Sequence, residues 1–105
     1  SESDLDALPF GVIQLTAEGT ILQYNMYEED LARRRASDVI GKNFFTEVAP
    51  CTDVREFAGR YREGVAAGIL HETFDYVFAF TPPKPVRVTL YFSSGTGTGW
   101  VFVRG

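Results

Sequence analysis

Apolar and polar residues alternate along two short stretches near the start of the chain. Residues 10–16 read FGVIQLT and residues 21–25 read ILQYN. The segment between them contains Gly19, which can adopt a positive φ at no steric cost. Two alternating runs joined by a tight turn predict a β-hairpin.

The alternation then gives way to helical patterns. Met26 to Arg35 is rich in charge and has no β-branched residue, which predicts a short helix. Ser37 is a candidate N-cap for one further helical turn that ends at Gly41. Phe44 and Phe45 lead from this turn into the segment around residue 50.

The longest predicted helix runs from Val54 to Ala67. Thr52 or Asp53 can cap its start, and Gly68 can end it. Its predicted buried stripe repeats every four residues and consists of Phe57, Tyr61 and Val65.

Three further strands are predicted after this helix. They cover Glu72 to Phe80, Pro85 to Phe92 and Trp100 to Arg104, with a glycine-rich turn at residues 95–99. Strands that follow one another without intervening helices favour an α+β fold over a doubly wound one. We therefore expect residues 1–105 to form a single domain: a five-stranded antiparallel sheet with helices packed mainly on one face.

The composition is that of a globular domain, since 45% of the residues are hydrophobic and 23% are charged. A net charge of −4 argues against a nucleic-acid-binding protein, which needs a basic surface. No apolar run is long enough to span a membrane, and we identify no signal peptide. The single cysteine excludes an internal disulfide and is typical of a reducing compartment, so we expect a cytoplasmic protein.

Cys51 is the first candidate for chemistry. It follows Pro50 and comes just before the predicted long helix, whose N-terminal N–H groups and dipole favour a thiolate. A thiolate is both a nucleophile and an anchor for an acyl group. In an arbitrary domain, however, a single cysteine is more often a small buried hydrophobic residue.

Tyr24 and Glu28 form the second candidate. They are four residues apart where a strand meets a helix, so their side chains can face the same side. A buried glutamate without a cation nearby stays protonated and donates a hydrogen bond, as tyrosine does. Two such donors make a site for an oxygen anion, although glutamate is more often exposed.

Other patterns support weaker hypotheses. The rings at alternate positions from Phe74 to Phe80 share one face of a strand and can line an aromatic pocket or fill the core. Arg33 to Arg35 is typical of a solvated surface. No CxxC, HExxH, P-loop or GxSxG motif is present. His71 is the only possible histidine partner for a cysteine hydrolase.

The string VIGKNFFTEVAPCTD at Val39 to Asp53 resembles the chromophore-attachment region of the photoactive yellow protein family. The similarity continues through residues 10–25, EGVAAG at residues 63–68 and WVFV at residues 100–103, so it covers nearly the whole chain. The resemblance implies a PAS fold and a blue-light photoreceptor that turns over no substrate and is therefore not an enzyme.

The resemblance also implies a cofactor, p-coumaric acid (4-hydroxycinnamic acid), held as a thioester on Cys51. Light would isomerise it from trans to cis, and a proton transfer from Glu28 would start a conformational signal. The family pattern puts Tyr24 and Glu28 at the phenolate and Arg34 over the ring. The implied ring neighbours and pocket wall are Phe78, Tyr76, Ile13, Val48, Ala49, Pro50 and Thr52.

The chain departs from the family pattern at several points. Ala32 replaces a threonine that supports the phenolate network. The loop from Thr81 to Lys84 is shorter and lacks a methionine linked to dark recovery, so we expect slow recovery. Arg33 and Arg35 are alternatives to Arg34 as the covering arginine.

The N-terminal cap of free-standing family members is also absent. We therefore expect either a trimmed domain or part of a larger sensor, with a phytochrome or histidine kinase module as partner. The residues are also compatible with two other functions. One is a PAS module that binds a ligand or partner without light chemistry, and the other is a thiol enzyme that uses Cys51.

Overall fold

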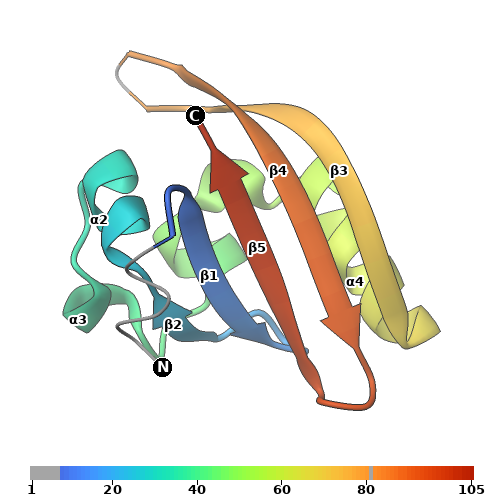
Figure 1. The fold of residues 1–105 in the computed structure, drawn as a ribbon. Helices are drawn as coiled ribbons and strands as arrows, with labels where there is room; N and C mark the ends of the chain where they lie inside the picture. The colour runs from blue at the N-terminus through green and yellow to red at the C-terminus, as the bar shows by residue number, and fades with distance from the viewer. Residues whose placement is uncertain (1–7, 81) are drawn as a thin grey trace.

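The computed structural model describes residues 8–80 and 82–105, so the expectation about Thr81 lies outside the described residues. Five strands form one antiparallel sheet in the order β2-β1-β5-β4-β3 (Figure 1), which confirms the predicted α+β architecture. The strands are β1 (Gly11–Thr16), β2 (Ile21–Tyr24), β3 (Ile69–Phe78), β4 (Lys84–Ser93) and β5 (Thr98–Arg104).

The helical segments lie between β2 and β3 in sequence. They are α2 (Met26–Ala32), α3 (Ala36–Val39), the π-helical turn η1 (Phe44–Val48), the 3-10 turn η2 (Pro50–Thr52), the π-helical turn η3 (Arg55–Gly59) and α4 (Arg60–Ala67). α2 packs beside β1, and α4 packs against β3 and β4 (Figure 1). No helix in the described part of the chain is long and apolar enough to cross a membrane.

The first hairpin forms as predicted. Gly19 has a φ of 95° in the turn, and its N–H donates to the Thr16 carbonyl. β2 ends at Tyr24, one residue before the predicted end, because Asn25 instead becomes the N-cap of α2. The Asn25 side chain accepts the N–H of Glu28 and so begins the helix.

The predicted helix from Met26 to Arg35 is too long. It ends when Arg33 adopts a left-handed conformation with a φ of 56°, and the Arg33 N–H donates to the Glu29 carbonyl. The predicted cap at Ser37 is also wrong. The Glu29 carboxylate accepts the Ala36 N–H at 2.6 Å, so the cap of α3 comes from the preceding helix.

The predicted long helix is divided into η3 and α4, and it ends at Gly68 as expected, with a φ of 82°. Neither predicted N-cap residue caps it. The Thr52 hydroxyl donates to the Ala49 carbonyl at 2.7 Å, and Asp53 forms an ion pair with Arg62 at 2.9 Å. Both side chains therefore bond to groups other than the N–H groups at the start of the helix.

β3 begins and ends earlier than the predicted range of residues 72–80. Phe78 at its end pairs with Lys84 at the start of β4. Pro82 and Pro83 lie in the loop between the two strands, where the absence of an N–H breaks no ladder bond.

The core lies between the sheet and the helices. Phe57 and Tyr61 are buried as predicted, whereas Val65 is only half-buried. The Tyr61 hydroxyl donates to the Thr16 carbonyl at 2.8 Å. Gly99, predicted as part of a flexible turn, lies inside β5, where a Cβ would overlap the Tyr61 hydroxyl.

Candidate functional site

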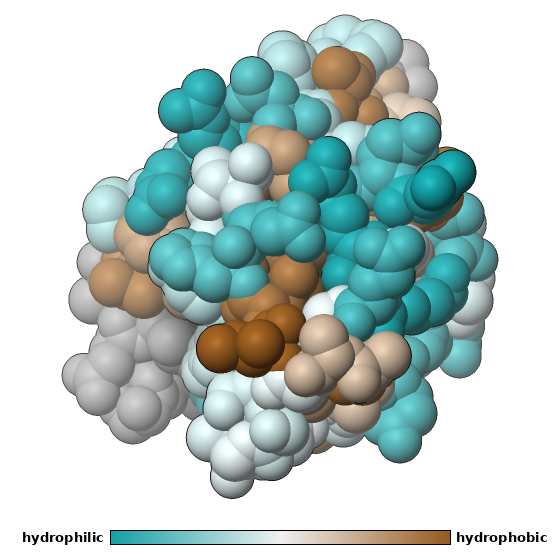
Figure 2. Space-filling view, turned by 90° about the vertical axis from the view of Figure 1, so that its right-hand side faces the viewer, coloured by the Kyte–Doolittle hydropathy of each residue, from teal (hydrophilic) through white to brown (hydrophobic). Residues whose placement is uncertain are grey.

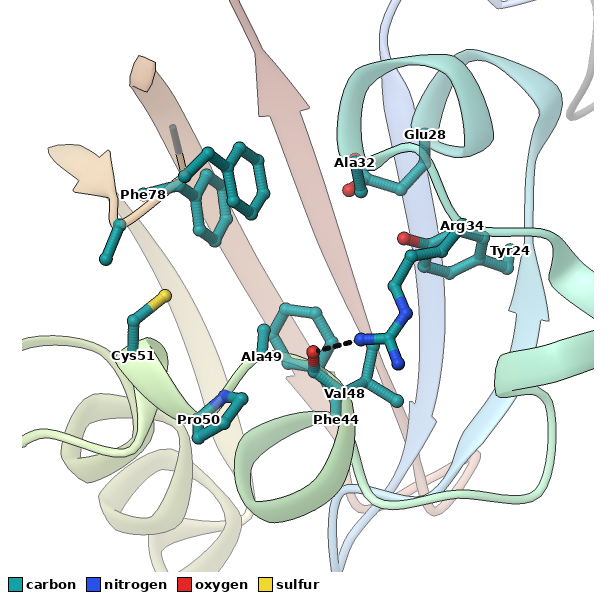
Figure 3. Close-up of a pocket in the computed structure, with 12 residues that line it drawn as sticks. Tyr24, Glu28, Ala32, Arg34, Phe44, Val48, Ala49, Pro50, Cys51 and Phe78 are labelled. Carbon is teal, nitrogen blue, oxygen red and sulfur yellow. Dashed lines mark hydrogen bonds between the residues drawn. The ribbon is translucent and has the colours of Figure 1, made fainter. Parts of the chain in front are cut away.

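A pocket of about 440 Å³ lies among α2, η1, η2 and the end of β3 (Figure 3). The sequence-predicted residues that line it are Tyr24, Glu28, Arg34, Val48, Ala49, Pro50, Cys51 and Phe78. Its other lining residues are Ala32, Phe44, Ala79 and Phe80. Residues that are far apart in the sequence therefore meet around one cavity.

Three sequence-predicted residues lie behind this wall rather than on it. Ile13 is fully buried in the hydrophobic core. Thr52 is fully buried, with its hydroxyl on the Ala49 carbonyl. The Tyr76 hydroxyl donates to the backbone carbonyl of Cys51. Thr52 and Tyr76 thus both bond to the backbone segment that contains Cys51.

Cys51 is a free, half-buried thiol on one side of the pocket, near Phe78 (Figure 3). It lies inside η2, with Pro50 at the first position of that turn. The next helical turn begins only at Arg55, so the expectation that Cys51 directly precedes a helix N-terminus was wrong. Pro50 and the buried Thr52 fix the backbone on both sides of the thiol.

Tyr76 holds the Cys51 backbone from the neighbouring strand. Burial raises the pKa of the Tyr76 hydroxyl, and the nearby Cys51 and Glu56 add to the rise. The hydroxyl therefore stays protonated and donates to the Cys51 carbonyl at neutral pH. This bond couples the position of the thiol to β3.

Tyr24 and Glu28 lie on the opposite side of the pocket (Figure 3), with only 7% and 3% of their surfaces exposed. The Asn25 side chain places them, because its oxygen accepts both the Glu28 N–H at 3.0 Å and the Val12 N–H at 2.9 Å. This double acceptor ties the first turn of α2 to β1. The prediction from their spacing, that the side chains of Tyr24 and Glu28 face the same side, is therefore confirmed.

Burial sets the protonation of this pair. It raises the pKa of Glu28 to about 8, opposed by the neighbouring Tyr24 hydroxyl. Burial also raises the pKa of Tyr24, and the charge of Glu28 adds to that rise, while Arg34 lowers it. At neutral pH both side chains therefore keep their protons and are hydrogen-bond donors.

The Glu28 carboxyl is also short of partners. Its Oε1 is buried and has no hydrogen-bond partner among the described residues. Gly11 of β1 leaves the room that this oxygen occupies, since a Cβ at Gly11 would overlap it. A buried polar atom without a partner is uncommon in native proteins and often marks a functional group.

Arg34 lies at the outer edge of the pocket, and its Nη1 donates to the Val48 carbonyl at 2.8 Å (Figure 3). The side chain is largely exposed. Arg33 and Arg35 line a separate surface depression with Glu29 and not this pocket. The structure thus distinguishes Arg34 within the arginine run.

Sequence reasoning missed some residues of the site. Phe44 lies in a π-helical turn, which has no simple hydrophobic period to reveal it. Asn25 and Glu28 follow the N-cap pattern of a short polar residue with glutamate three positions later, and that signal could have identified the start of α2. Phe80 was assigned to the strand, but it follows β3 and stacks on Phe78 with 5.1 Å between ring centroids.

Comparisons with known proteins agree with this arrangement. A family model described as PAS fold matches residues 2–103. A photoactive yellow protein from Rhodothalassium salexigens is 48% identical over 104 residues, which cover 98% of this chain and 83% of that protein. One from Halochromatium salexigens is 47% identical, with 99% of this chain and 84% of that protein covered.

A solved structure gives the same result. The photoactive yellow protein domain of the sensor histidine kinase Ppr from Rhodospirillum centenum superposes with a TM-score of 0.95 at 42% identity, covering 100% of this chain and 93% of that one. The two folds therefore agree over essentially the full length. The chain belongs to the photoactive yellow protein family of PAS-fold proteins.

Proposed function

We propose that this chain is a blue-light photoreceptor that carries p-coumaric acid as a thioester on Cys51. One observation carries the proposal: a single pocket has the chain's only thiol on one side and, on the other, a buried glutamate whose Oε1 has no hydrogen-bond partner among the described residues. Membership of the photoactive yellow protein family supports it.

The residues present fit such a group. A cavity of about 440 Å³ is within the usual size range of small-molecule sites. Phe44 and Phe78 offer aromatic walls to a flat ring. The protonated Glu28 carboxyl and the nearby Tyr24 hydroxyl are donors that suit one anionic oxygen, as a phenolate provides.

When bound, the coumaroyl group supplies blue-light absorption and a reversible trans–cis isomerisation. Glu28 and Tyr24 donate hydrogen bonds that offset the desolvation of a buried anion. Arg34 adds positive charge at the pocket edge. Tyr76 keeps the Cys51 backbone in place through its bond to the carbonyl.

Glu28 also holds a proton that it could give to a phenolate oxygen bound beside it. Its loss leaves a carboxylate in a buried site against Gly11 and next to Tyr24. Each unit of pKa mismatch is worth about 1.36 kcal/mol, which is a large fraction of the stability of a small domain. Local opening around α2 is the expected response, and no substrate is turned over in such a cycle.

The proposal extends to the signalling partner. The solved relative from Rhodospirillum centenum is a domain of a sensor histidine kinase. By that analogy, this domain passes its signal to a histidine kinase module. The family resemblance adds a phytochrome module as an alternative partner, and we propose a cytoplasmic location for either assembly.

The test is reconstitution with activated p-coumarate, followed by intact-mass and absorption measurements. Wild type gains the mass of one coumaroyl group and a visible absorption band, and Cys51→Ala gains neither. Tyr24→Phe is the matched control, because it keeps the thiol and is labelled, but with a shifted band. Labelling of Cys51→Ala, or a labelled wild type without a visible band, contradicts the proposal; the second result favours a PAS module without light chemistry.

A further inference from the structure

The two edges of the sheet differ. The short β2 is covered, because the Gly41 N–H donates to the Ile21 carbonyl at 2.8 Å and the Ile21 N–H donates to the Lys42 carbonyl at 2.9 Å. A bridge between Thr20 and Asn43 extends this cover. β3 is ten residues long, and within the described part of the chain no backbone hydrogen bond outside its ladder with β4 involves it.

The antiparallel ladder determines which groups of β3 are unpaired. Just before the strand, the Ser94 N–H donates to the Gly68 carbonyl at 2.9 Å. Because hydrogen-bonded pairs alternate along a ladder, the even positions from Leu70 to Phe78 bond to β4. The odd positions from Ile69 to Val77 direct their N–H and C=O groups outward. Their side chains lie on the sheet face away from the helices.

Figure 2 shows the side of the molecule on which this edge lies; the surface is mainly hydrophilic, with a group of hydrophobic side chains below its centre. Ile69 and Val77 are 74% and 57% exposed. Between them lie His71, Thr73 and Asp75, all exposed. A long exposed edge with apolar side chains near both ends is a template for pairing with another strand.

We propose that two copies of this chain pair antiparallel along β3, with Thr73 of each copy at the two-fold axis. In this register Ile69 faces Val77, and His71 faces Asp75, and symmetry makes each contact twice. The outward backbone groups of the two copies then form hydrogen-bonded pairs. The sheet becomes continuous through ten strands, five from each copy.

The order of residues selects this register. A shift of two residues in one direction puts Ile69 opposite Asp75, and a shift in the other puts His71 opposite Val77. Either shift exchanges an apolar pair and a polar pair for mismatched ones, which cross-strand packing disfavours.

The polar side chains are available for this contact. Asp75 is bonded to Arg87 at 3.1 Å but its side chain stays 78% exposed. The His71 ring stacks on Tyr91 with 4.3 Å between centroids, which holds it on the outer face. A second copy therefore meets positioned groups rather than mobile ones.

Sedimentation equilibrium of the intact chain over a concentration series tests the pairing, and it does so independently of chromophore attachment. Wild type is expected to show a monomer–dimer equilibrium. His71→Asp opposes like charges twice and is expected to raise the dissociation constant at least about tenfold. Asp75→Lys is expected to weaken pairing as well, and the double variant His71→Asp/Asp75→Lys restores opposite charges and recovers the dimer.

Glu47→Lys is the control, because it makes the same change in charge as Asp75→Lys at an exposed position outside β3. It is expected to leave the dissociation constant unchanged. Thermal unfolding of each variant checks that the fold is retained. A wild type that is monomeric at every concentration overturns the proposal, as does an unaltered dimer in His71→Asp or a double variant that fails to recover.

Discussion

Glu28 keeps its proton because it is buried. Gly11 supplies space but no hydrogen bond, Asn25 holds the first turn of α2 against β1, and Tyr24 closes the pocket side. The result is a carboxyl in an apolar setting, whose charged form is poorly solvated. Its protonation therefore links the pocket to the stability of the chain.

This link predicts a pH dependence for the protein without added coumarate. The pKa of Glu28 is raised from 4.5 to about 8 on folding, so between these values the folded state holds a proton that the unfolded state has lost. Stability therefore falls as pH rises through this window, by about 1.4 kcal/mol per pH unit from this group, and levels off above it. Glu28→Gln cannot ionise and is expected to remove this slope.

Urea unfolding at a series of pH values measures the slope. Glu47→Gln, at an exposed position, serves as the control and keeps the wild-type dependence. A Glu28→Gln variant with the same slope as wild type would show that another group titrates in this window.

Tyr76 is the second residue whose role is testable. Tyr76→Phe removes the donor to the Cys51 carbonyl and leaves the ring in place. We expect a loss of about 0.5–1.5 kcal/mol in the free energy of unfolding and slower labelling of Cys51 by activated coumarate. Tyr27→Phe, at an exposed position, is expected to change neither. Unchanged stability and labelling in Tyr76→Phe would mean that the bond does not position the thiol.

At the scale of elements, the connection from α2 to α3 is short and strained. Arg33 ends α2 in the left-handed conformation that glycine adopts most readily, and its neighbour Arg34 crosses to the Val48 carbonyl. The Glu29 carboxylate, which belongs to the first turn of α2, accepts the Ala36 N–H at the start of α3. One left-handed residue thus positions both a helix start and the arginine of the pocket.

Arg33→Gly is expected to stabilise the chain by about 0.5–1 kcal/mol, because glycine has no Cβ to strain a left-handed backbone. Gly68→Ala makes the opposite change at the end of α4, where φ is 82°, and is expected to destabilise by a similar amount. Chemical denaturation of both variants measures the two signs. A destabilised Arg33→Gly would indicate that the side chain of Arg33 stabilises the fold by more than the strain of its left-handed backbone destabilises it.

At the scale of the whole molecule, Phe57 joins the core to the pocket. Its ring lies 5.9 Å from that of Phe44 and 6.3 Å from that of Phe78, between centroids. Both of these rings line the pocket. The wall that would hold a chromophore is therefore continuous with the packing that holds the helices on the sheet.

Phe57→Leu is expected to lower the free energy of unfolding by about 1–3 kcal/mol, since it leaves a fully buried ring site partly empty. A single cooperative transition should remain. Phe102→Leu, at a half-buried position on the other sheet face, is the control with a smaller loss. An equal loss in both variants would contradict the prediction that Phe57 contributes more to the free energy of unfolding than Phe102 does.

The sequence predicted the strands better than the helices, for physical reasons. Alternation along β1 and β4 depends only on which face is buried, and it is visible residue by residue. The helix starts depended on partners distant in sequence or on competing bonds: Glu29 caps α3, and Thr52 bonds back to Ala49. Local capping rules could not anticipate those choices.

The site was predicted mainly from the family resemblance. Spacing alone favours a surface position for Glu28 and a core position for Cys51. The sequence also did not predict that Phe44 lines the pocket, because Phe44 belongs to a π-helical turn without a hydrophobic period. Tyr76 shares a strand face with Phe78, and only the packing shows that one supports the Cys51 backbone while the other lines the cavity.

The pairing of β1 with β5 has a consequence for the timing of folding. In the middle of the sheet, Gly11 of β1 pairs with Val103 of β5, so the first and last strands of this domain are direct neighbours. Before β5 is made, β1 has only β2 as a neighbour and β4 has only β3. Pairing of β5 with β1 then joins residues that are far apart in the sequence, which costs loop-closure entropy. A growing chain on the ribosome therefore cannot complete this domain until β5 is free to pair. Any module fused after Gly105 gives the domain time to form while translation continues.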